Sequence, residues 1–514
     1  MGKKNQFIKT IGLSMSVVFS NAIAAIAEEI PSFSSNLQSK SALLAQSTDT
    51  QDDIIKPAQT PVNNTEKLNP SANPLSFPTQ ADEVEVDPQK PITLEQAIEL
   101  SLKNNQDVQA TRLQVEQSAL ALREARAALF PTLDFGTGLD YSNSAFLDSV
   151  NEQIIEERGE GSLTNPETSS FTFSTSVSLG YDIYDGGRRG AAIRASQKQL
   201  QSNELELESI VEQTRFETSR DYYNLQNSDA QVEIEQAAVE DANQTLKDAQ
   251  LLEKAGLGTR FDVLRAEVEL AQAQQRLSTA QANQNISRRQ LAETLNVSHD
   301  TDLSTADKIE EAGSWSLSLS ESIVQAFKNR AELEQLLLQR EIGAEQRKVA
   351  LSQVRPTLSA DASYSINDDF EDSFDTSDQY SVGLNLNWRL YDGGAARASA
   401  RQSDKDIEIA EAQFANQRNQ IRFAVEQAYY GLEANQKNIG TATKEVELAE
   451  ESLRLARLRF QAGVGTQTDV IEAQTQLTTA RGNLLSSIID YNQSYADLQR
   501  QVSNRPDNGL QDLP

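Results

Sequence analysis

Four segments of this chain alternate between apolar and polar residues, which is the pattern of β-strands with one apolar face. Apolar residues take mostly odd positions in about 133–141 and 171–183, and even positions in about 358–366 and 382–390. Glycine, serine, threonine and aspartate fill most of the positions between. The pattern predicts two hairpins, at about 131–185 and 356–392, with strands about ten residues long.

A long helical segment follows each predicted hairpin. From Arg188 to about Lys254 there is no proline, and no glycine after Gly190, so nothing interrupts a helix that would extend roughly 100 Å. Apolar residues recur every seven positions in both segments. They are Leu225, Val232, Val239 and Leu246 in the first, and Leu432, Ile439, Val446, Leu453 and Phe460 in the second. This spacing predicts left-handed coiled-coil packing against neighbouring helices.

The two halves of the chain repeat one another at a distance of 207 residues. Tyr184–Gly187 returns as Tyr391–Gly394, Ala255–Thr259 returns in the variant Ala462–Thr466, and two adjacent tyrosines are also repeated. A proline precedes each hairpin. A repeat of this length is too long for a solenoid, and it predicts two similar halves packed beside each other. Each half is expected to run helix, hairpin, very long helix, tight turn, long helix.

Six segments follow from these patterns. Residues 1–27 have the basic start, apolar stretch and small-residue end of a signal peptide, and 28–90 are a proline-, serine- and asparagine-rich leader expected to be disordered. The other four are the first repeat at 92–300, a connector at 301–317, the second repeat at 318–503 and a tail at 504–514. Thr93 with Gln96 predicts the first helix start.

Composition narrows the possible functions. The chain has 514 residues, 38% hydrophobic, and a formal net charge of −30, which would become −33 after removal of residues 1–27. Such a charge disfavours nucleic-acid binding. There is no cysteine, and the single histidine, His299, is expected in a solvated connector loop. Without catalytic or metal-binding constellations, the chain is expected to be neither an enzyme nor a cofactor- or metal-binding protein.

A soluble sandwich would show the same alternation as the predicted hairpins. A membrane barrel is favoured because the polar positions are small throughout and the strand length suits a tilted bilayer span. The chain supplies only four strands, and unpaired backbone groups in lipid cost several kcal/mol each. A barrel therefore requires oligomerisation, with eight strands from two copies or twelve from three.

The duplicated halves, the prolines, the Tyr-Asp-Gly-Gly returns and the Ala-Gly-x-Gly-Thr turns together resemble the TolC-type outer-membrane efflux and secretion channels over about residues 92–503. The resemblance implies a mainly α fold, in which a coiled-coil α-helical barrel in the periplasm joins a transmembrane β-barrel. It also implies a homotrimer with twelve strands, embedded in outer-membrane lipid. Its partners would be a periplasmic adaptor and an inner-membrane pump of the RND or ABC type. Drugs, metabolites or unfolded proteins would leave through it.

Particular residues acquire expected roles from this resemblance. The helix–strand junctions are expected at Pro131, Pro356, Gly186, Gly187, Gly393 and Gly394. The turns that would contact the adaptor hold Gly256, Gly258, Thr259, Gly463, Gly465 and Thr466. The periplasmic aperture would be lined by Asp469, Glu472, Asp262 and Arg260. For the threonines and aspartates of the turns, helix capping alone is the competing interpretation, and for Glu472 it is a solvated helix surface.

Other interpretations stay open at this point. A periplasmic coiled-coil scaffold, or an adaptor of an export machinery without a channel of its own, would also contain long helices. Aspartates crowd the second hairpin's tip at 368–378, where a solvated loop is favoured over a calcium site because the spacing of an EF-hand is missing. Tyr141, Tyr181, Tyr364 and Trp388 are candidates for an aromatic girdle.

Overall fold

The computed structural model describes residues 87–143, 169–297, 301–369 and 376–502, together with Ala145, Ser149 and Gln153. All of them lie in the unit that spans Asn64–Pro514. The predictions for the signal peptide 1–27, for most of the leader, for His299 and for the tail 504–514 lie outside the described residues, as does the middle of the acidic tip at 370–375.

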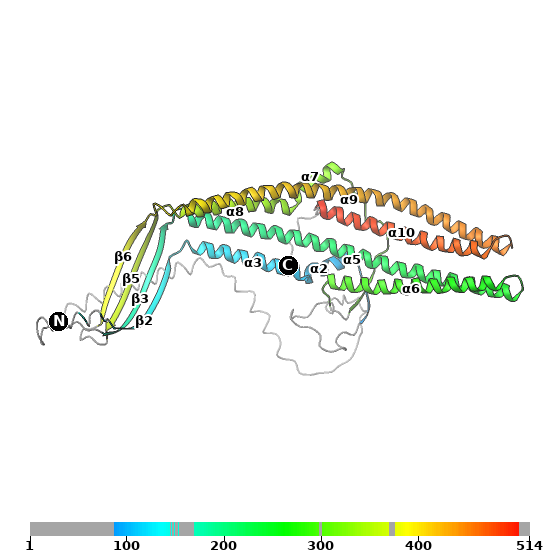
Figure 1. The fold of residues 1–514 in the computed structure, drawn as a ribbon, viewed down its shortest axis with the longest axis horizontal. Coiled ribbons are helices and arrows are strands. Elements are labelled where there is room, and N and C mark those ends of the chain that lie inside the picture. Colours follow the sequence, from blue (N-terminus) through cyan, green and yellow to red (C-terminus); the bar gives the residue numbers. More distant parts are fainter. Residues whose placement is uncertain are drawn as a thin grey trace, which may run out of the picture. The chain divides into compact units, whose positions relative to one another are not determined.

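The two repeats contain the same series of elements (Figure 1). The first consists of α2 (Leu94–Asn104), α3 (Gln106–Ala127), β2 (Thr132–Asn143), β3 (Ser169–Tyr184), α5 (Arg188–Lys254) and α6 (Arg260–Thr294). The second consists of α7 (Leu319–Asn329), α8 (Ala331–Ser352), β5 (Thr357–Asp369), β6 (Ser377–Asn387), α9 (Ala395–Gln461) and α10 (Gln467–Val502). Both α5 and α9 have 67 residues.

The structure differs from the prediction at three places. The helix before each hairpin is divided in two, because Asn105 and Arg330 have extended backbones. The Asn105 side chain accepts from the amides of Asp107 and Val108 and so caps α3. A further strand, β1 (Asp87–Ile92), begins inside the segment assigned to the leader, and it pairs in parallel with β4 (Thr301–Thr305) in the connector.

Short side chains take a large part in the packing of the long helices. The predicted seven-residue rows lie along the packed face, where Leu225, Leu432 and Leu453 are buried. A second row of alanines is buried beside them: Ala242 and Ala249 on α5, Ala266, Ala273 and Ala280 on α6, and Ala442 and Ala449 on α9. Alanine at every second core position lets paired helices approach closely. Among the described residues, none of the helices has an apolar stretch suited to spanning a bilayer.

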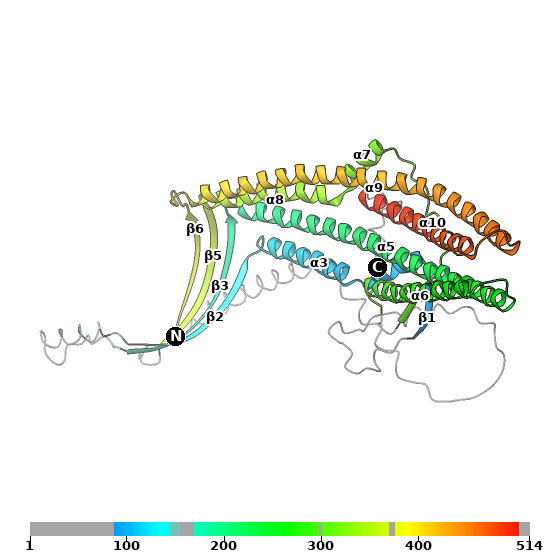
Figure 2. The same cartoon turned by 45° about the vertical axis from the view of Figure 1, so that its right-hand side comes forward.

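The middle of α5 is tied to the β1–β4 pair (Figure 2). Tyr222 is fully buried; its hydroxyl donates to the Asp307 carboxylate at 2.8 Å and lies 3.1 Å from the Ile92 carbonyl oxygen. Burial, helped by the Asp307 hydrogen bond, raises the pKa of the Tyr222 phenol. These contacts fix the start of the first repeat and the connector on the same turn of α5.

The four longer strands form one antiparallel sheet in the order β2-β3-β5-β6. The two hairpins are joined through β3 and β5, so the outer edges of β2 and β6 have no strand partner within the described chain. Figure 2 shows the four strands bending together as a curved layer at one end of the long helices.

One partly buried carboxylate connects three helices. Glu332, at the start of α8, accepts from Arg330 at 2.9 Å, from Arg500 of α10 at 3.1 Å and from the Ser209 hydroxyl of α5 at 3.0 Å. Burial raises the pKa of Glu332, but the hydrogen bond and charge of Arg330 and the charge of Arg500 outweigh it and lower the pKa to about 2. The ionised carboxylate therefore stabilises the folded chain.

We expect Glu332→Gln to lower the thermal unfolding midpoint at neutral pH. The free energy of unfolding should fall by on the order of 2 kcal/mol, a value reduced to allow for the partial exposure of Glu332. Because the folded pKa is depressed, the contribution is fully present above about pH 4.5 and disappears as the pH falls towards 2. The variant and the unaltered chain should therefore converge in acid. Glu334→Gln, at an exposed position of the same helix, is the control. A difference that is independent of pH would contradict the assignment.

Candidate functional site

The four-stranded sheet has one apolar and one polar face. The register places Leu133 opposite Leu179, Val177 opposite Tyr364, and Ala362 opposite Val382, so the apolar positions of all four strands lie on the same side. These side chains are mostly exposed, as Phe135 at 73% and Val382 at 82% illustrate. Of the predicted girdle residues, Tyr141, Tyr181 and Tyr364 have the parity of this face. Trp388 follows the end of β6, and its indole donates to the Val354 carbonyl at 3.2 Å. An apolar face this large and uncovered requires an apolar surrounding.

The opposite face is lined by small and acidic residues. Ser176 lies between Gly136 and Ser365, and Ser363 lies between Ser178 and Ser381. Aspartates with the parity of this face include Asp134, Asp140, Asp182 and Asp361. Within β2, β3, β5 and β6 as described there is no lysine or arginine. Small side chains keep this face open, and its charge favours cations over anions.

The predicted junction residues lie where helices change into strands. Pro131 falls between α3 and β2, and Pro356 between α8 and β5, as their missing amide hydrogens require. At the returns, Gly186, Gly187, Gly393 and Gly394 all have φ between +71° and +93°, a conformation that disfavours other residues.

The aspartates of the two returns accept hydrogen bonds from amides at the starts of the long helices, whose N-cap residues are Gly187 and Gly394. Asp185 accepts from the amides of Gly187 at 3.1 Å and Arg189 at 2.7 Å. Asp392 accepts from those of Gly394 at 2.8 Å and Ala396 at 2.7 Å. The amides of Ala396 and Gly394 lower the pKa of Asp392. Both returns therefore have the same backbone structure.

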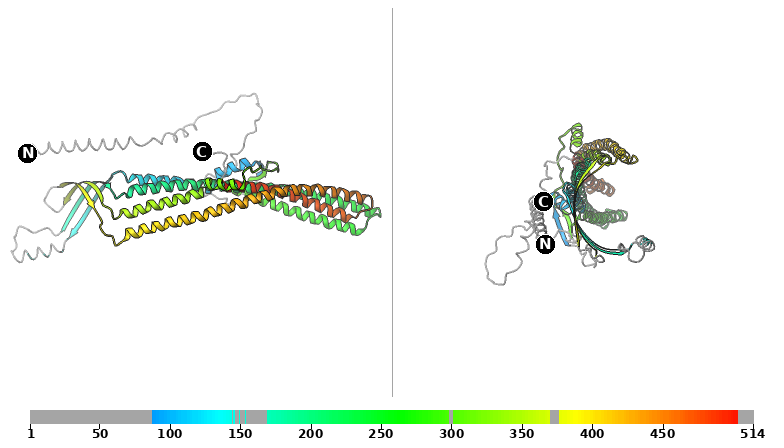
Figure 3. Two further views of the ribbon diagram at one scale, coloured as in Figure 1. Left: turned by 90° about the horizontal axis from the view of Figure 1, so that it is seen from above. Right: turned by 90° about the vertical axis from the view of Figure 1, so that its left-hand side faces the viewer.

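The turns between the long helices also share one structure, and Figure 3 shows them at the same end of the helices. Gly256 and Gly463 have φ of +71° and +72° and end the first helix of each pair. Gly258 and Gly465 lie so close to the preceding helix that an added Cβ would be 3.1 Å from Leu252 or Arg459. Thr259 caps α6 in a reciprocal pair with Asp262, and Thr466 makes the equivalent contacts with Asp469.

The structure confirms the capping role of the aperture candidates Asp262 and Asp469. The backbone amide and side chain of Thr466, with the charge of Arg459, lower the pKa of Asp469. Glu472 lies one turn further along α10, and both carboxylates are exposed on the helix surface. Arg260 is exposed and is not brought to either of them. Arg265, the equivalent of Glu472 in the first repeat, instead donates to the Thr468 hydroxyl and so joins α6 to α10.

A groove of about 500 Å³ lies between the two helix pairs. The sequence did not predict it. Asp241 and Arg457 form an ion pair of 2.8 Å across it, and Thr245 and Gln474 are hydrogen-bonded. Gln467 at its edge is 4% exposed, and neither amide atom of its side chain has a hydrogen-bond partner in the structure. Partners about 220 residues apart have no local sequence signal, so only the fold reveals this groove.

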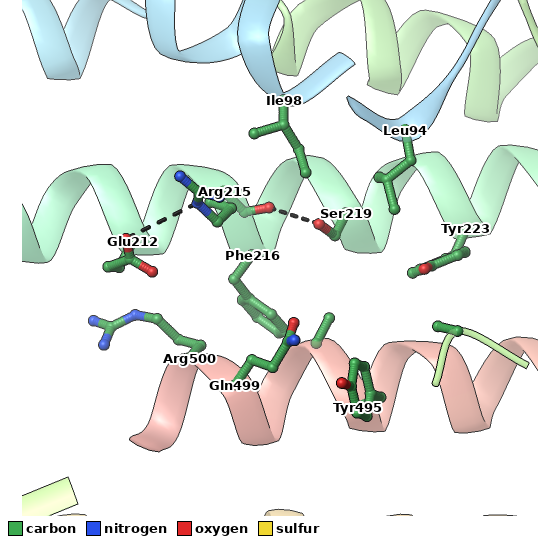
Figure 4. A pocket seen from close by; sticks show the side chains of 12 residues that line it. Leu94, Ile98, Glu212, Arg215, Phe216, Ser219, Tyr223, Tyr495, Gln499 and Arg500 are labelled. Atoms are coloured by element: carbon green, nitrogen blue, oxygen red, sulfur yellow. Dashed lines mark hydrogen bonds and ion pairs between the residues drawn. The ribbon is translucent and has the colours of Figure 1, made fainter. Parts of the chain in front are cut away.

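A smaller cavity of about 250 Å³ lies where α2 and α10 pack on α5 (Figure 4). Its wall combines Phe216, Tyr223 and Leu94 with Glu212 and Arg500. The Ser219 hydroxyl donates to the Arg215 carbonyl at 2.9 Å, which is ordinary helix bonding. Among the described residues there is no cluster suited to a metal ion. The cavity lacks a catalytic constellation, so the two-faced sheet and the turns remain the candidate functional parts.

These features define a class of protein: a duplicated chain whose long helices end in a two-faced sheet built for lipid on one side and water on the other. The sequence profile of outer membrane efflux proteins matches residues 97–297 and 322–502. The chain therefore belongs to the outer membrane efflux protein family, and the TolC-type resemblance is confirmed. Membership places it in the outer membrane, with its helical part in the periplasm.

Individual relatives are distant. The chain is 26% identical to the outer membrane efflux protein BepC of Brucella suis over 189 residues, 37% of this chain and 41% of that protein. It is 23% identical to a probable efflux pump outer membrane protein, SepC, of Pseudomonas putida over 430 residues, 81% and 84% of the two chains. The solved structure of the outer membrane protein VceC from Vibrio cholerae has the same fold, with a TM-score of 0.66 at 20% identity, covering 80% of this chain and 96% of that one.

We expect Gly465→Ala to loosen the turn between α9 and α10. The added methyl group would press on the backbone of Arg459 and Phe460 at the end of α9. The Arg459 carbonyl there accepts hydrogen bonds from the amides of Val464 and Gly465. Hydrogen exchange at these amides should accelerate. Gly440→Ala, inside α9 with no atom within 4 Å of the new Cβ, should instead stabilise the helix by about 1 kcal/mol. Equal behaviour of the two variants would contradict this packing.

Proposed function

We propose that three copies of this chain form an exit duct through the outer membrane, serving a tripartite efflux pump or type I secretion system. The observation that carries the proposal is the sheet itself, apolar on one face, polar on the other and unpaired at both edges. In lipid those edges must find partners, and further copies of the chain supply identical ones. Twelve strands leave a lumen, whereas eight would be filled by side chains.

The seven-residue rows and the exposed apolar residues of α3 and α9 support the same assembly. Leu113 and Leu120 on α3, and Ile409, Phe423 and Tyr430 on α9, are exposed in the single chain, and several are multiples of seven residues apart. Helices of neighbouring copies would cover them and extend the duct through the periplasm as a helical barrel.

The turns are the proposed contact with a periplasmic adaptor, which would link the duct to an inner-membrane pump of the RND or ABC type. The groove beside them holds the buried, unpartnered amide of Gln467, and exposed apolar residues surround the turns, among them Leu257 and Val464. Such a surface suits a partner helix tip that brings both apolar contacts and hydrogen-bonding groups.

Asp469 and Glu472 are the proposed lining of the periplasmic mouth. Three copies would bring six carboxylates to one opening, and a ring of carboxylates favours the passage of cations. The depressed pKa of Asp469 keeps this charge in mildly acidic solution. The side chains proposed to line the duct are polar and mostly small, and they form a smooth wall rather than a binding pocket. Such a wall favours cargo of varied shape, whether drugs, metabolites or unfolded proteins.

We expect Asp469→Asn with Glu472→Gln to lower the cation-to-anion permeability ratio in bilayer recordings and to leave the trimer intact. Asparagine keeps an acceptor for Thr466, so the cap survives while the charge is lost. Glu95→Gln with Glu99→Gln removes the same number of exposed charges from α2, far along the chain from the turns. If the α2 control changes the ratio as much as the tip variant, the tip does not line the mouth.

The duct itself is tested with the purified protein in mild detergent. The mass of the complex should be that of three chains, and it should give stable single-channel currents in planar bilayers. A periplasmic scaffold or adaptor would instead wash from membranes with salt and conduct no ions. A monomer without channel activity would refute the proposed function.

A further inference from the structure

The two hairpins have the same internal register. Thr132 pairs with Gly180 in the first, and Thr357 pairs with Asn387 in the second. The equivalent residues of β2 and β5 are 225 positions apart in the sequence, and those of β3 and β6 are 207 apart. The same two offsets relate every pair along the hairpins where both are described, as far as Ser142–Ser170 and Asn367–Ser377. The repeats are therefore equivalent residue by residue, and not only in their order of elements.

The junctions beside the hairpins obey the same offsets. The amide of Phe130 donates to the carbonyl of Ala127 at 3.0 Å, and the amide of Arg355 donates to the carbonyl of Ser352 at 3.0 Å. The aspartate-capped returns at Gly186 and Gly393 have φ of +71° and +72°. Each repeat thus presents one turn before its hairpin and one return after it, with matching backbones.

Within the chain, the return of the first repeat is covered by the turn of the second. A Cβ on Gly186 would lie 2.9 Å from the Cβ of Arg355 and 3.0 Å from the carbonyl oxygen of Ser352. The Arg355 guanidinium donates to the Gly186 carbonyl at 3.0 Å. The adjoining strands β3 and β5 pair as far as Tyr184, with Val177 opposite Tyr364 and one register shift between Asp182 and Tyr184.

The equivalent return of the second repeat has no residue packed over its first glycine, Gly393. Nothing lies within 4 Å of a Cβ placed on Gly393, and Tyr391 is 83% exposed where its counterpart Tyr184 is 49% exposed. Phe130, the counterpart of Arg355, is also exposed. In addition, β3 continues to Tyr184 along its partner, whereas β6 ends at Asn387, four residues before the position that corresponds to Tyr184.

We propose that the contact between the two repeats within one chain is the template for the contact between copies. On the offsets of the repeat, β6 of one copy pairs with β2 of the next so that Leu384 lies opposite Leu139, and Phe130 covers Gly393 as Arg355 covers Gly186. Residues 388–391 then extend β6 and place Trp388 opposite Phe135 on the lipid face. The inference rests on the proposed assembly of several copies and specifies its register and the residue that closes the seam.

The register is tested by disulfide formation, since the chain has no cysteine of its own. Leu139→Cys with Leu384→Cys should oxidise in membranes to covalent dimers and trimers, because opposed strand residues lie within disulfide distance. Matched controls are Leu384→Cys with Thr137→Cys or with Tyr141→Cys, which share the face but lie two residues out of register. A disulfide within one chain is excluded because β2 and β6 are at opposite edges of the sheet, about 14 Å apart.

Efficient cross-linking of either control in preference to the Leu139 pair would overturn the register, even with the trimer intact. Loss of the trimer itself, measured separately by mass on the unaltered protein, would refute the proposed function instead. The two failures are thus distinguishable.

The seam residue is tested by two substitutions. Phe130→Ala should lower the temperature at which the assembled complex dissociates. Phe130→Arg should retain more of that stability, because it restores the side chain that performs this role within the chain. Val324→Ala, which shortens a similarly exposed apolar residue of α7, is the control. Dissociation of the Phe130→Ala complex at the unaltered temperature would exclude Phe130 from the seam.

Discussion

An open sheet edge in hydrocarbon leaves a row of amide and carbonyl groups without partners, at a cost of several kcal/mol each. Other features of the structure are compatible with this constraint. The strands keep a regular alternation through their middle, because a slip of one residue there would turn Asp134, Asp182 and Asp361 towards lipid. The polar face carries glycine and serine at many of its positions, so that several sheets can curve around one open space. Closure requires equal hairpins at equal tilt, and duplication of one hairpin within the chain provides them.

Duplication preserved the backbone while the side chains diverged according to their surroundings. Arg189, which follows the first return, donates to the carbonyls of Ala128 and Ile183, and its place in the second repeat is taken by Ala396. In the middle of the long helices, Tyr222 is buried against the β1–β4 pair, whereas its counterpart Tyr429 is only partly buried. The halves therefore share their junction and turn chemistry and differ where they meet unlike neighbours.

Local patterns in the sequence predicted much of this fold. The strands, the junction glycines, the capping aspartates and the turns all have short-range causes, such as alternation, positive φ or a side chain three residues away. The helix breaks at Asn105 and Arg330 were missed because neither residue is a strong helix breaker. The alanine seams were missed because alanine is common throughout helices. The Arg265–Thr468 contact and the groove at Gln467 depend on packing between distant segments, and no local pattern encodes such packing.

The magnitudes of these contacts also explain where the molecule can rearrange. Near the turns, each helix pair has its own apolar cluster, with Leu453, Val470 and Leu477 in one and Val263 with Ala249 in the other. Between the pairs, largely exposed polar contacts include the Asp241–Arg457 ion pair and the Arg265–Thr468 hydrogen bond. Exposed ion pairs contribute about 0.2–1 kcal/mol each, and a buried amide without a partner, as at Gln467, costs about 1–3 kcal/mol. Separation of the two helix pairs at their tips therefore requires little free energy, whereas the buried tyrosine network further along α5 resists it.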